Sequence, residues 1–176
     1  VVVYGNRAYE DALLEIKDIF ESREFKTIAG GAFIGEHSFA KSVASDRPCE
    51  EDLKIAREFG VAIKVKLSQL ENGIQGIYDL ELRGNRPYRE RKISLPLGPK
   101  TTDACIECNI CSNNCPVSAI TYDHCGQVDE DVCIRCCSCV KKCPTQAKYF
   151  DERLDGVKAW VVEHCSSPKK EPELFI

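Results

Sequence analysis

The stretches CIECNICSNNCPVSAI (105–120) and CIRCCSCVKKCPTQAK (133–148) are two copies of one short unit. Each copy reads Cys-x2-Cys-x2-Cys-x3-Cys-Pro, and equivalent residues lie 28 positions apart, as Cys105 and Cys133 do. A repeat of this kind indicates one structural unit that is used twice. We therefore expect the cysteine-rich region to fold with pseudo-two-fold symmetry.

The cysteine spacing in each copy is typical of a loop that binds an iron–sulfur cluster. Cysteines at positions i, i+3 and i+6 can bind three corners of one cubane, whereas the fourth, followed by proline, points away and binds the other cluster. The spacing predicts two [4Fe–4S] clusters with crossed ligands. The expected ligands are Cys105, Cys108, Cys111 and Cys143 for the first cluster, and Cys133, Cys136, Cys139 and Cys115 for the second.

Zinc sites and disulfide bonds are the other common uses of closely spaced cysteines. Zinc sites usually pair two Cys-x2-Cys units across a longer loop, whereas each copy here places the four cysteines of its motif within eleven positions. Disulfides need an oxidising compartment, and the start VVVYGNRAYED (1–11) has neither the basic residues nor the cleavage site of a signal peptide. The spacing therefore favours iron–sulfur clusters over both.

Four of the twelve cysteines fall outside the repeat pattern, and the simplest interpretation is that they are buried thiols. They are Cys49, Cys125, Cys137 and Cys165. Cys137 directly follows the expected ligand Cys136, where its thiol could donate a hydrogen bond to a cluster sulfur or replace a ligand. Cys125 lies between the two copies and could reach the edge of a cluster.

The composition is that of an ordinary soluble protein, with 176 residues of which 43% are hydrophobic and 30% charged. No apolar run approaches the roughly 18 residues of a membrane span. The formal net charge of −4 argues against nucleic acid and anionic membranes as partners. Without an export signal, we expect a cytoplasmic protein. The chain has no Met, and we expect Val1 to be a processed, truncated or incompletely known end.

The chain divides into three segments by pattern. Residues 1–70 alternate between short apolar runs and helical periodicity, which predicts an α/β segment with parallel strands and helices. The expected strands are 1–4 and 26–35, and the expected helices are 8–22 and 50–70. Residues 71–100 lack a persistent apolar face and are predicted to be a linker or strap. Residues 101–176 are predicted to form a small α+β domain with a C-terminal extension.

No catalytic arrangement is visible in the sequence. His37, His124 and His164 have no partner at catalytic spacing, and no P-loop is present. We therefore expect an electron carrier rather than a catalyst, passing one electron at a time between redox partner proteins. Apolar loop residues such as Ile106 and Ile134 should exclude water from the clusters, which favours a low potential.

The basic stretch RGNRPYRERK (83–92) has two interpretations. A run of charge is most often a solvated surface, here that of a linker. The alternative is a docking surface for an acidic redox partner.

Residues 101–150 resemble the two-cluster bacterial ferredoxins, and all eight ligand positions match the motif of that family. The resemblance implies a small α+β fold that holds both clusters and serves electron transfer. The family often has glycine after the second cysteine of each loop, where this chain has Asn109 and Cys137. Asparagine adopts a left-handed backbone more readily than cysteine does, so this departure concerns the loop backbone and not the ligands.

The stretches VVVYGNRAYEDALLEI (1–16) and FKTIAGGAFIGEHSF (25–39), with the long helix after them, resemble the second half of a flavodoxin-like domain. With the linker NRPYRERK (85–92) and the ending KKEPELF (169–175), the chain is similar to flavodoxin–ferredoxin fusion proteins of anaerobes. The resemblance implies that the first half of the flavodoxin-like domain, with its phosphate-binding loop, is missing before Val1.

In such a protein the loop after the first strand of this chain would face the flavin. The resemblance places Tyr4, Gly5, Asn6, Arg7 and Tyr9 at that loop, where a tyrosine could stack on the flavin ring. FMN is then expected to bind only when the N-terminal half is supplied, and the alternative function is that of an iron–sulfur flavoprotein oxidoreductase. The strand edge left open predicts self-association or binding of a complementary N-terminal segment.

Overall fold

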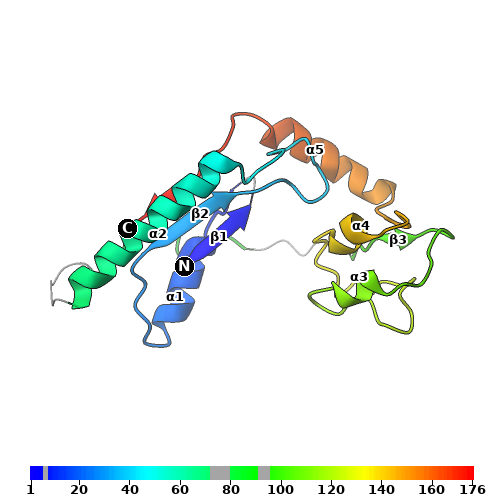
Figure 1. Ribbon diagram of the computed structural model, residues 1–176, viewed down its shortest axis with the longest axis horizontal. Helices are drawn as coiled ribbons and strands as arrows, with labels where there is room; N and C mark the ends of the chain where they lie inside the picture. Colours follow the sequence, from blue (N-terminus) through cyan, green and yellow to red (C-terminus); the bar gives the residue numbers. More distant parts are fainter. Residues whose placement is uncertain (6–7, 72–79, 91–95) are drawn as a thin grey trace. The chain divides into compact units, whose positions relative to one another are not determined.

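The computed structural model describes residues 1–5, 8–71, 80–90 and 96–176 (Figure 1). Its contacts separate two units: Val1–Arg91 together with Val162–Ile176, and Lys92–Val161. We call them the N-terminal unit and the cysteine module. The chain leaves the N-terminal unit, forms the cysteine module, and returns through a helix that crosses the boundary.

The N-terminal unit is built on two parallel strands joined by a helix. Strand β1 (Val2–Gly5) pairs with β2 (Gly30–Ile34) in the register Val2↔Gly31 to Gly5↔Ile34, and α1 (Ala12–Glu21) connects them. Every residue of β2 is buried or half-buried, as expected for the apolar run GGAFI. The predicted mixed α/β character with parallel strands is confirmed.

A third strand comes from the far end of the chain. Strand β5 (Glu173–Phe175) pairs antiparallel with β2, so the sheet order is β1-β2-β5. The sequence predicts residues 101–176 as one domain with an extension, whereas Val162–Ile176 group with the N-terminal unit. The strand ELF has only three residues, which is too short to show a hydrophobic period. Its pairing with β2 is made by backbone groups, which the side-chain pattern does not reveal.

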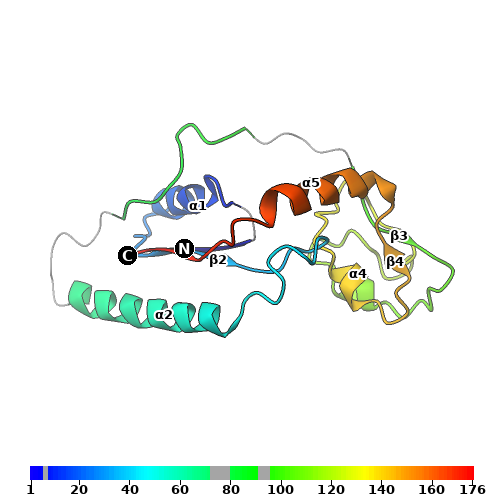
Figure 2. The same cartoon turned by 90° about the horizontal axis from the view of Figure 1, so that it is seen from above.

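Helices cover both faces of this sheet. Helix α1 and the 22-residue α2 (Glu50–Glu71) lie on opposite faces (Figure 2). Leu13 of α1 is fully buried and packs against Gly30 of β2. A Cβ added at Gly30 would lie 3.3 Å from Leu13 Cδ2 and 2.7 Å from Leu82 Cδ2, so a larger residue there would require these leucine side chains to shift. From α2, Phe59 is buried against Phe33, with ring centroids 6.2 Å apart.

Residues 80–90, the longest described part of the predicted strap, are tied to α1. Buried Asp11 accepts hydrogen bonds from the backbone N–H groups of Asn85 and Arg89, both at 2.7 Å. The basic side chains of this segment are paired within the unit: Arg83 with Glu173, Arg86 with Asp18, and Arg89 with Glu10. These pairs offset the charges of three basic residues of the stretch, whereas Arg91 and Lys92 fall outside the described residues.

A buried ion pair connects three further segments of the N-terminal unit. Arg47 is 8% exposed and donates two hydrogen bonds to the carboxylate of Asp52, which is 2% exposed. Asp52 also accepts the backbone N–H of Cys49 at 2.8 Å, and Arg47 donates to the carbonyl of Lys170 at 3.1 Å. The pair thereby joins the loop before α2, the start of α2, and the C-terminal tail.

The cysteine module contains little regular structure. Strands β3 (Lys100–Thr101) and β4 (Lys148–Tyr149) form a two-stranded antiparallel sheet. The helical elements are α3 (Ile110–Asn113), α4 (Ser138–Lys142), the 3-10 turn η1 (Glu152–Leu154) and α5 (Asp155–Cys165), which crosses into the N-terminal unit.

Candidate metal centres

The two repeats adopt the same backbone conformation. Asn109 and Cys137, at equivalent positions, both have a left-handed backbone, with φ of 58° and 61°, and each directly precedes its short helix. Left-handed residues also recur at two further equivalent pairs: Glu107 and Arg135, and Ser118 and Gln146. Asparagine and cysteine therefore fill the position that suits glycine without changing the course of the loop.

The three loop cysteines of the first repeat share a cavity with the last cysteine of the second repeat. Cys105, Cys108, Cys111 and Cys143 all line it. The cavity encloses about 310 Å³, part of it open to solvent, and its lining includes the apolar side chains of Ile106, Ile110, Pro144 and Ala147. The structure thus gathers the four residues predicted to hold the first cluster.

The second cavity has the reciprocal composition. Cys133, Cys136 and Cys139 from the second repeat line it together with Cys115 from the first. It holds about 340 Å³ of empty space, part of it open to solvent, and its apolar lining includes Val117, Ala119, Ile120, Val128 and Phe150. A group bound by all four thiols of either cavity would join the two repeats.

Backbone N–H groups donate to sulfurs at equivalent positions of the two repeats. The N–H of Ala119 lies 3.2 Å from Cys115 Sγ, and the N–H of Ala147 lies 3.2 Å from Cys143 Sγ. Such bonds favour the thiolate. Burial opposes ionisation of Cys143, but the Thr145 hydroxyl and the Ala147 N–H outweigh it, so the pKa of Cys143 is lowered.

Two buried cysteines show the opposite balance. Burial raises the pKa of Cys139 to about 11, and burial together with the neighbouring Cys139 and Cys136 raises that of Cys137 to about 12. A metal ligand must be a thiolate, so a positive metal centre has to offset the burial of Cys139. Cys137 lines the second cavity, but its Sγ lies 3.6 Å from the carbonyl oxygen of Arg135.

The first cavity holds further groups besides its four predicted ligands. Cys125 is buried and lines this cavity, as its position between the repeats suggested. Asn109 lines it too, and its Oδ1 is the one buried side-chain polar atom without a hydrogen-bond partner among the described residues. This oxygen can only accept a hydrogen bond, so it calls for a donor such as an ordered water.

Lys148 also lines the first cavity, although the sequence interpretation passed over it. It is 3% exposed. Lysine is normally a surface residue, so its type gives no hint of burial. The usable signal was the repeat itself, because alignment of the two copies sets Lys148 opposite the apolar Ile120.

The chemical groups that line both cavities fit an iron–sulfur cluster. All twelve cysteines lie in the described part of the chain, and all are free thiols. Within that same part, no three His, Cys, Asp or Glu side chains are grouped so that they could hold one metal ion. A cubane is instead bound by four cysteines around it. The thiols, N–H donors and apolar lining of both cavities fit such a cluster.

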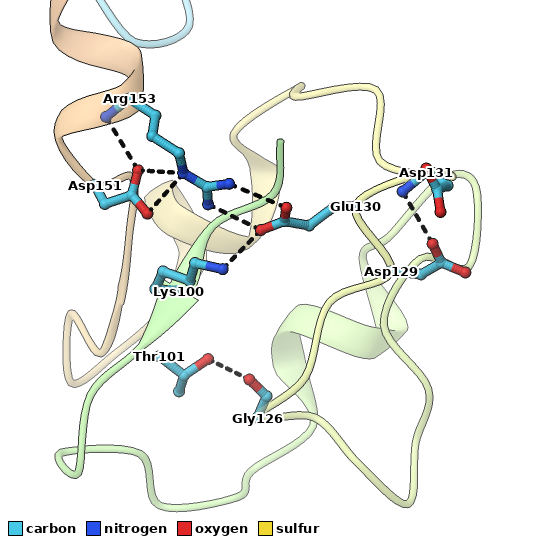
Figure 3. Close-up of polar contacts among 8 residues, drawn as sticks. All are labelled: Lys100, Thr101, Gly126, Asp129, Glu130, Asp131, Asp151 and Arg153. Atoms are coloured by element: carbon cyan, nitrogen blue, oxygen red, sulfur yellow. Dashed lines mark hydrogen bonds and ion pairs between the residues drawn. The ribbon is translucent and has the colours of Figure 1, made fainter. Parts of the chain in front are cut away.

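Polar contacts fasten the segments that carry these cavities. Figure 3 shows Glu130 between two cations, Lys100 at 2.7 Å and Arg153 at 3.0 Å. Arg153 also pairs with Asp151 at 2.9 Å. These cations lower the pKa of Glu130 to about 2, with hydrogen bonds from Arg153 the largest cause. The network joins β3, the segment before the second repeat, and the turn before α5.

The predicted flavin loop lines a separate cavity within the N-terminal unit. Tyr4, Gly5 and Tyr9 lie along it, whereas Asn6 and Arg7 fall outside the described residues. Gly5 and Ile34 line the same cavity, so it lies beside the carboxyl ends of the parallel strands β1 and β2, where α/β sheets place ligands.

Residues distant in sequence complete this cavity. Arg83, Lys170, Glu171 and Glu173 line it as well. Tyr9 donates a hydrogen bond to Glu173 at 2.9 Å, and Arg83 pairs with the same carboxylate at 2.7 Å. Burial and Glu173 raise the pKa of Tyr9 to about 12. Sequence reasoning missed these residues because nothing in the tail indicated that it returns to β2.

Comparison with known proteins identifies the cysteine repeats. Residues 99–121 and 127–149 each match the family model described as a 4Fe-4S binding domain. The searches of curated proteins and of solved structures found no match. Across the described ranges, no helix has both the length and the apolar character needed to cross a membrane. Residues 99–149 thus contain two ferredoxin-type 4Fe-4S motifs, which indicate iron–sulfur electron transfer.

Proposed function

We propose that the cysteine module passes single electrons at low potential through two [4Fe–4S] clusters with crossed ligands. The observation that carries the proposal is the composition of the two cavities, each with three cysteines of one repeat and the last cysteine of the other. The first cluster is assigned to Cys105, Cys108, Cys111 and Cys143. The second is assigned to Cys133, Cys136, Cys139 and Cys115.

When bound, a [4Fe–4S] cluster supplies a one-electron redox centre whose potential depends on charge, hydrogen bonds and solvent exposure. The chain's own residues set those conditions. Buried Ile120 and Ala119 line the second cavity and keep water from its inner side. The exposed Cys108 and Cys136 lie at the outer side of their cavities, where a partner protein can approach. This arrangement favours transfer between partner proteins over chemistry on a bound substrate.

The test is a cluster count followed by reduction. Anaerobically reconstituted protein should hold about eight irons and eight acid-labile sulfides, as two four-cysteine clusters require. Dithionite should then produce the paramagnetic resonance signals of reduced clusters. A value near four irons would mean that one cavity does not assemble, and silence under dithionite would mean that the clusters are only structural.

The second candidate function is that of an iron–sulfur flavoprotein oxidoreductase with a flavodoxin-like N-terminal unit. The cavity at the carboxyl ends of β1 and β2 favours it, because its aromatic residues Tyr4, Tyr9 and Phe33 could contact a flavin ring. This chain supplies part of such a site, and FMN binding would depend on a preceding N-terminal half. Native protein should release FMN on denaturation under this candidate, and protein purified without flavin would contradict it.

Among the residues that the structure describes, nothing pairs with the outer side of β1, and this open edge supports a proposal about partners. Strand β1 forms an outer strand of the sheet, and its Val2 and Tyr4 are 58% and 65% exposed. An exposed apolar edge strand is prone to pair with another strand. We propose that self-association or a complementary N-terminal segment covers it, in a cytoplasmic protein. The full chain should then self-associate unless a complementary segment is supplied, and a full chain that stays monomeric without one in analytical ultracentrifugation would contradict this.

A further inference from the structure

The two cavities differ in charge at one equivalent position of the repeat. Lys148 lines the first cavity and Ile120 the second, each following its repeat's last cysteine by five residues. Both side chains are 3% exposed. The backbone symmetry therefore brings a cation to one cavity and an apolar group to the other.

Among the described residues, the Lys148 ammonium is held by neutral oxygens only. Nζ donates to the Cys125 carbonyl at 2.6 Å, the Thr101 hydroxyl at 2.7 Å and the Gly126 carbonyl at 3.4 Å. Figure 3 shows the Thr101 hydroxyl directed at the Gly126 carbonyl, at 2.5 Å. In the described part of the chain, no carboxylate forms an ion pair with Lys148.

A buried cation without a carboxylate partner is costly unless another negative group lies near it. The predicted ligands of the first cavity supply such a group. Cys111 Sγ lies 3.7 Å from the same Cys125 carbonyl oxygen that accepts from Lys148, so the ammonium and this sulfur share one neighbour. Four thiolates around an iron–sulfur core carry net negative charge, and that charge increases by one on reduction.

The charge of Lys148 also lies near the second set of ligands, because Cys139 packs in the same buried cluster as Cys125, whose carbonyl accepts from Lys148. The second cavity has a cationic residue of its own in its lining, Arg135. Arg135 is only half-buried, and its backbone N–H lies 3.4 Å from Cys133 Sγ. Solvent screens a partly exposed charge more strongly than a buried one. Lys148 should therefore change the potential of its cluster more than Arg135 changes the potential of the second.

We propose that Lys148 is a potential-setting residue that makes the first cluster the easier of the two to reduce. The inference rests on the proposed function. The redox step adds one electron to the first cluster from a one-electron donor, which loses that electron, and no bond is made or broken. The ammonium stabilises the added negative charge, and the apolar Ile120 offers no such stabilisation at the second cluster.

The test compares three variants of the reconstituted protein by redox titration, with one-electron viologen mediators and paramagnetic resonance detection. Lys148→Gln removes the charge but keeps a hydrogen-bond donor, Lys148→Arg keeps the charge, and Arg135→Gln removes the partly exposed charge at the second cavity. A Cys108→Ser variant identifies the signal of the first cluster, because Cys108 lines only the first cavity. Iron content is measured on every sample.

We expect Lys148→Gln to weaken reduction of the first cluster about tenfold, a shift of 59 mV for a one-electron couple. The second cluster should shift less, and Lys148→Arg should restore the wild-type value. Arg135→Gln should move the second cluster less than Lys148→Gln moves the first. Unchanged potentials in Lys148→Gln with full iron content would overturn the proposal, as would equal shifts of both clusters. Failure of the proposed function would look different, since wild-type protein would then lack reducible clusters.

Discussion

In the N-terminal unit, apolar side chains such as Leu13 and Val43 are fully buried, and polar contacts join segments distant in sequence. In the cysteine module, three of the four residues at the centre of the core cluster are cysteines: Cys111, Cys125 and Cys139 pack with Ile120. A small module with so little apolar core needs bonds of another kind to be stable. The difference teaches that one chain uses ordinary burial for one unit and metal ligation for the other.

Removal of iron should show the difference between the two units most clearly. We expect an iron chelator to abolish the ordered structure of the cysteine module, because clusters with crossed ligands would bind its two repeats together and its apolar core is small. The N-terminal unit should keep its protected amides, since its contacts involve no predicted ligand. Hydrogen exchange along the chain would measure both responses, and equal loss of protection in the two units would contradict the proposed difference.

Replacement of a single predicted ligand should have the next largest effect on the cysteine module, and it tests whether the ligands are crossed. Cys143→Ala removes a second-repeat cysteine from the first cavity. It should therefore remove the first cluster, halve the iron content, and destabilise both repeats. Cys49→Ala, a change in the N-terminal unit, is the control and should leave the iron content unchanged. If Cys143→Ala instead removed the cluster of the second repeat, each repeat would bind its own cluster.

Loss of the buried ion pair should weaken the N-terminal unit alone. Asp52→Ala leaves the Arg47 guanidinium buried without its carboxylate, which typically costs about 3–5 kcal/mol. Urea unfolding followed by circular dichroism would measure this loss of unfolding free energy. The iron content would show whether the cysteine module is unaffected. Glu171→Gln is the matched control, because Glu171 is 60% exposed and lies 3.6 Å from the same guanidinium. An equally large effect of that control would contradict the assignment to burial.

The same pair predicts a dependence on pH. Hydrogen bonds from Arg47 lower the pKa of Asp52 to about 2, below the ordinary aspartate value of about 4. The stability that this group contributes is therefore present above pH 4 and is lost as the pH falls through 2. The difference in unfolding free energy between wild type and Asp52→Ala should shrink across this window, and a constant difference would contradict it.

The smallest effect should come from the strap over α1. Asp11→Ala removes the acceptor of the backbone N–H groups of Asn85 and Arg89. We expect faster proteolysis within residues 80–90, with global unfolding changed less than in Asp52→Ala. Asp18→Asn, which weakens the pairing with the exposed Arg86, should have a smaller effect on the same cleavage. Unchanged cleavage in Asp11→Ala would show that other contacts hold the strap.

The parts that the sequence predicts well are those encoded by local spacing. Helices α1 and α2 and the parallel pair β1–β2 follow from apolar periodicity, and the grouping of Cys143 with Cys105 follows from the repeat. The parts that it predicts poorly depend on contacts between distant segments. The pairing of β5, the lining of a cavity by Lys170, and the burial of Lys148 have no periodic signature, because single backbone or side-chain contacts decide them.

The return of the chain to β2 also bears on the order of folding. Gly30 pairs with Phe175, so one edge of the N-terminal sheet is built from residues that the ribosome adds only after the whole cysteine module. Contacts of such high contact order carry a loop-closure cost that must be met before they form. The whole cysteine module lies inside that loop, and its compaction around iron shortens the effective loop. We therefore expect cofactor supply during biosynthesis to influence how quickly the last strand docks.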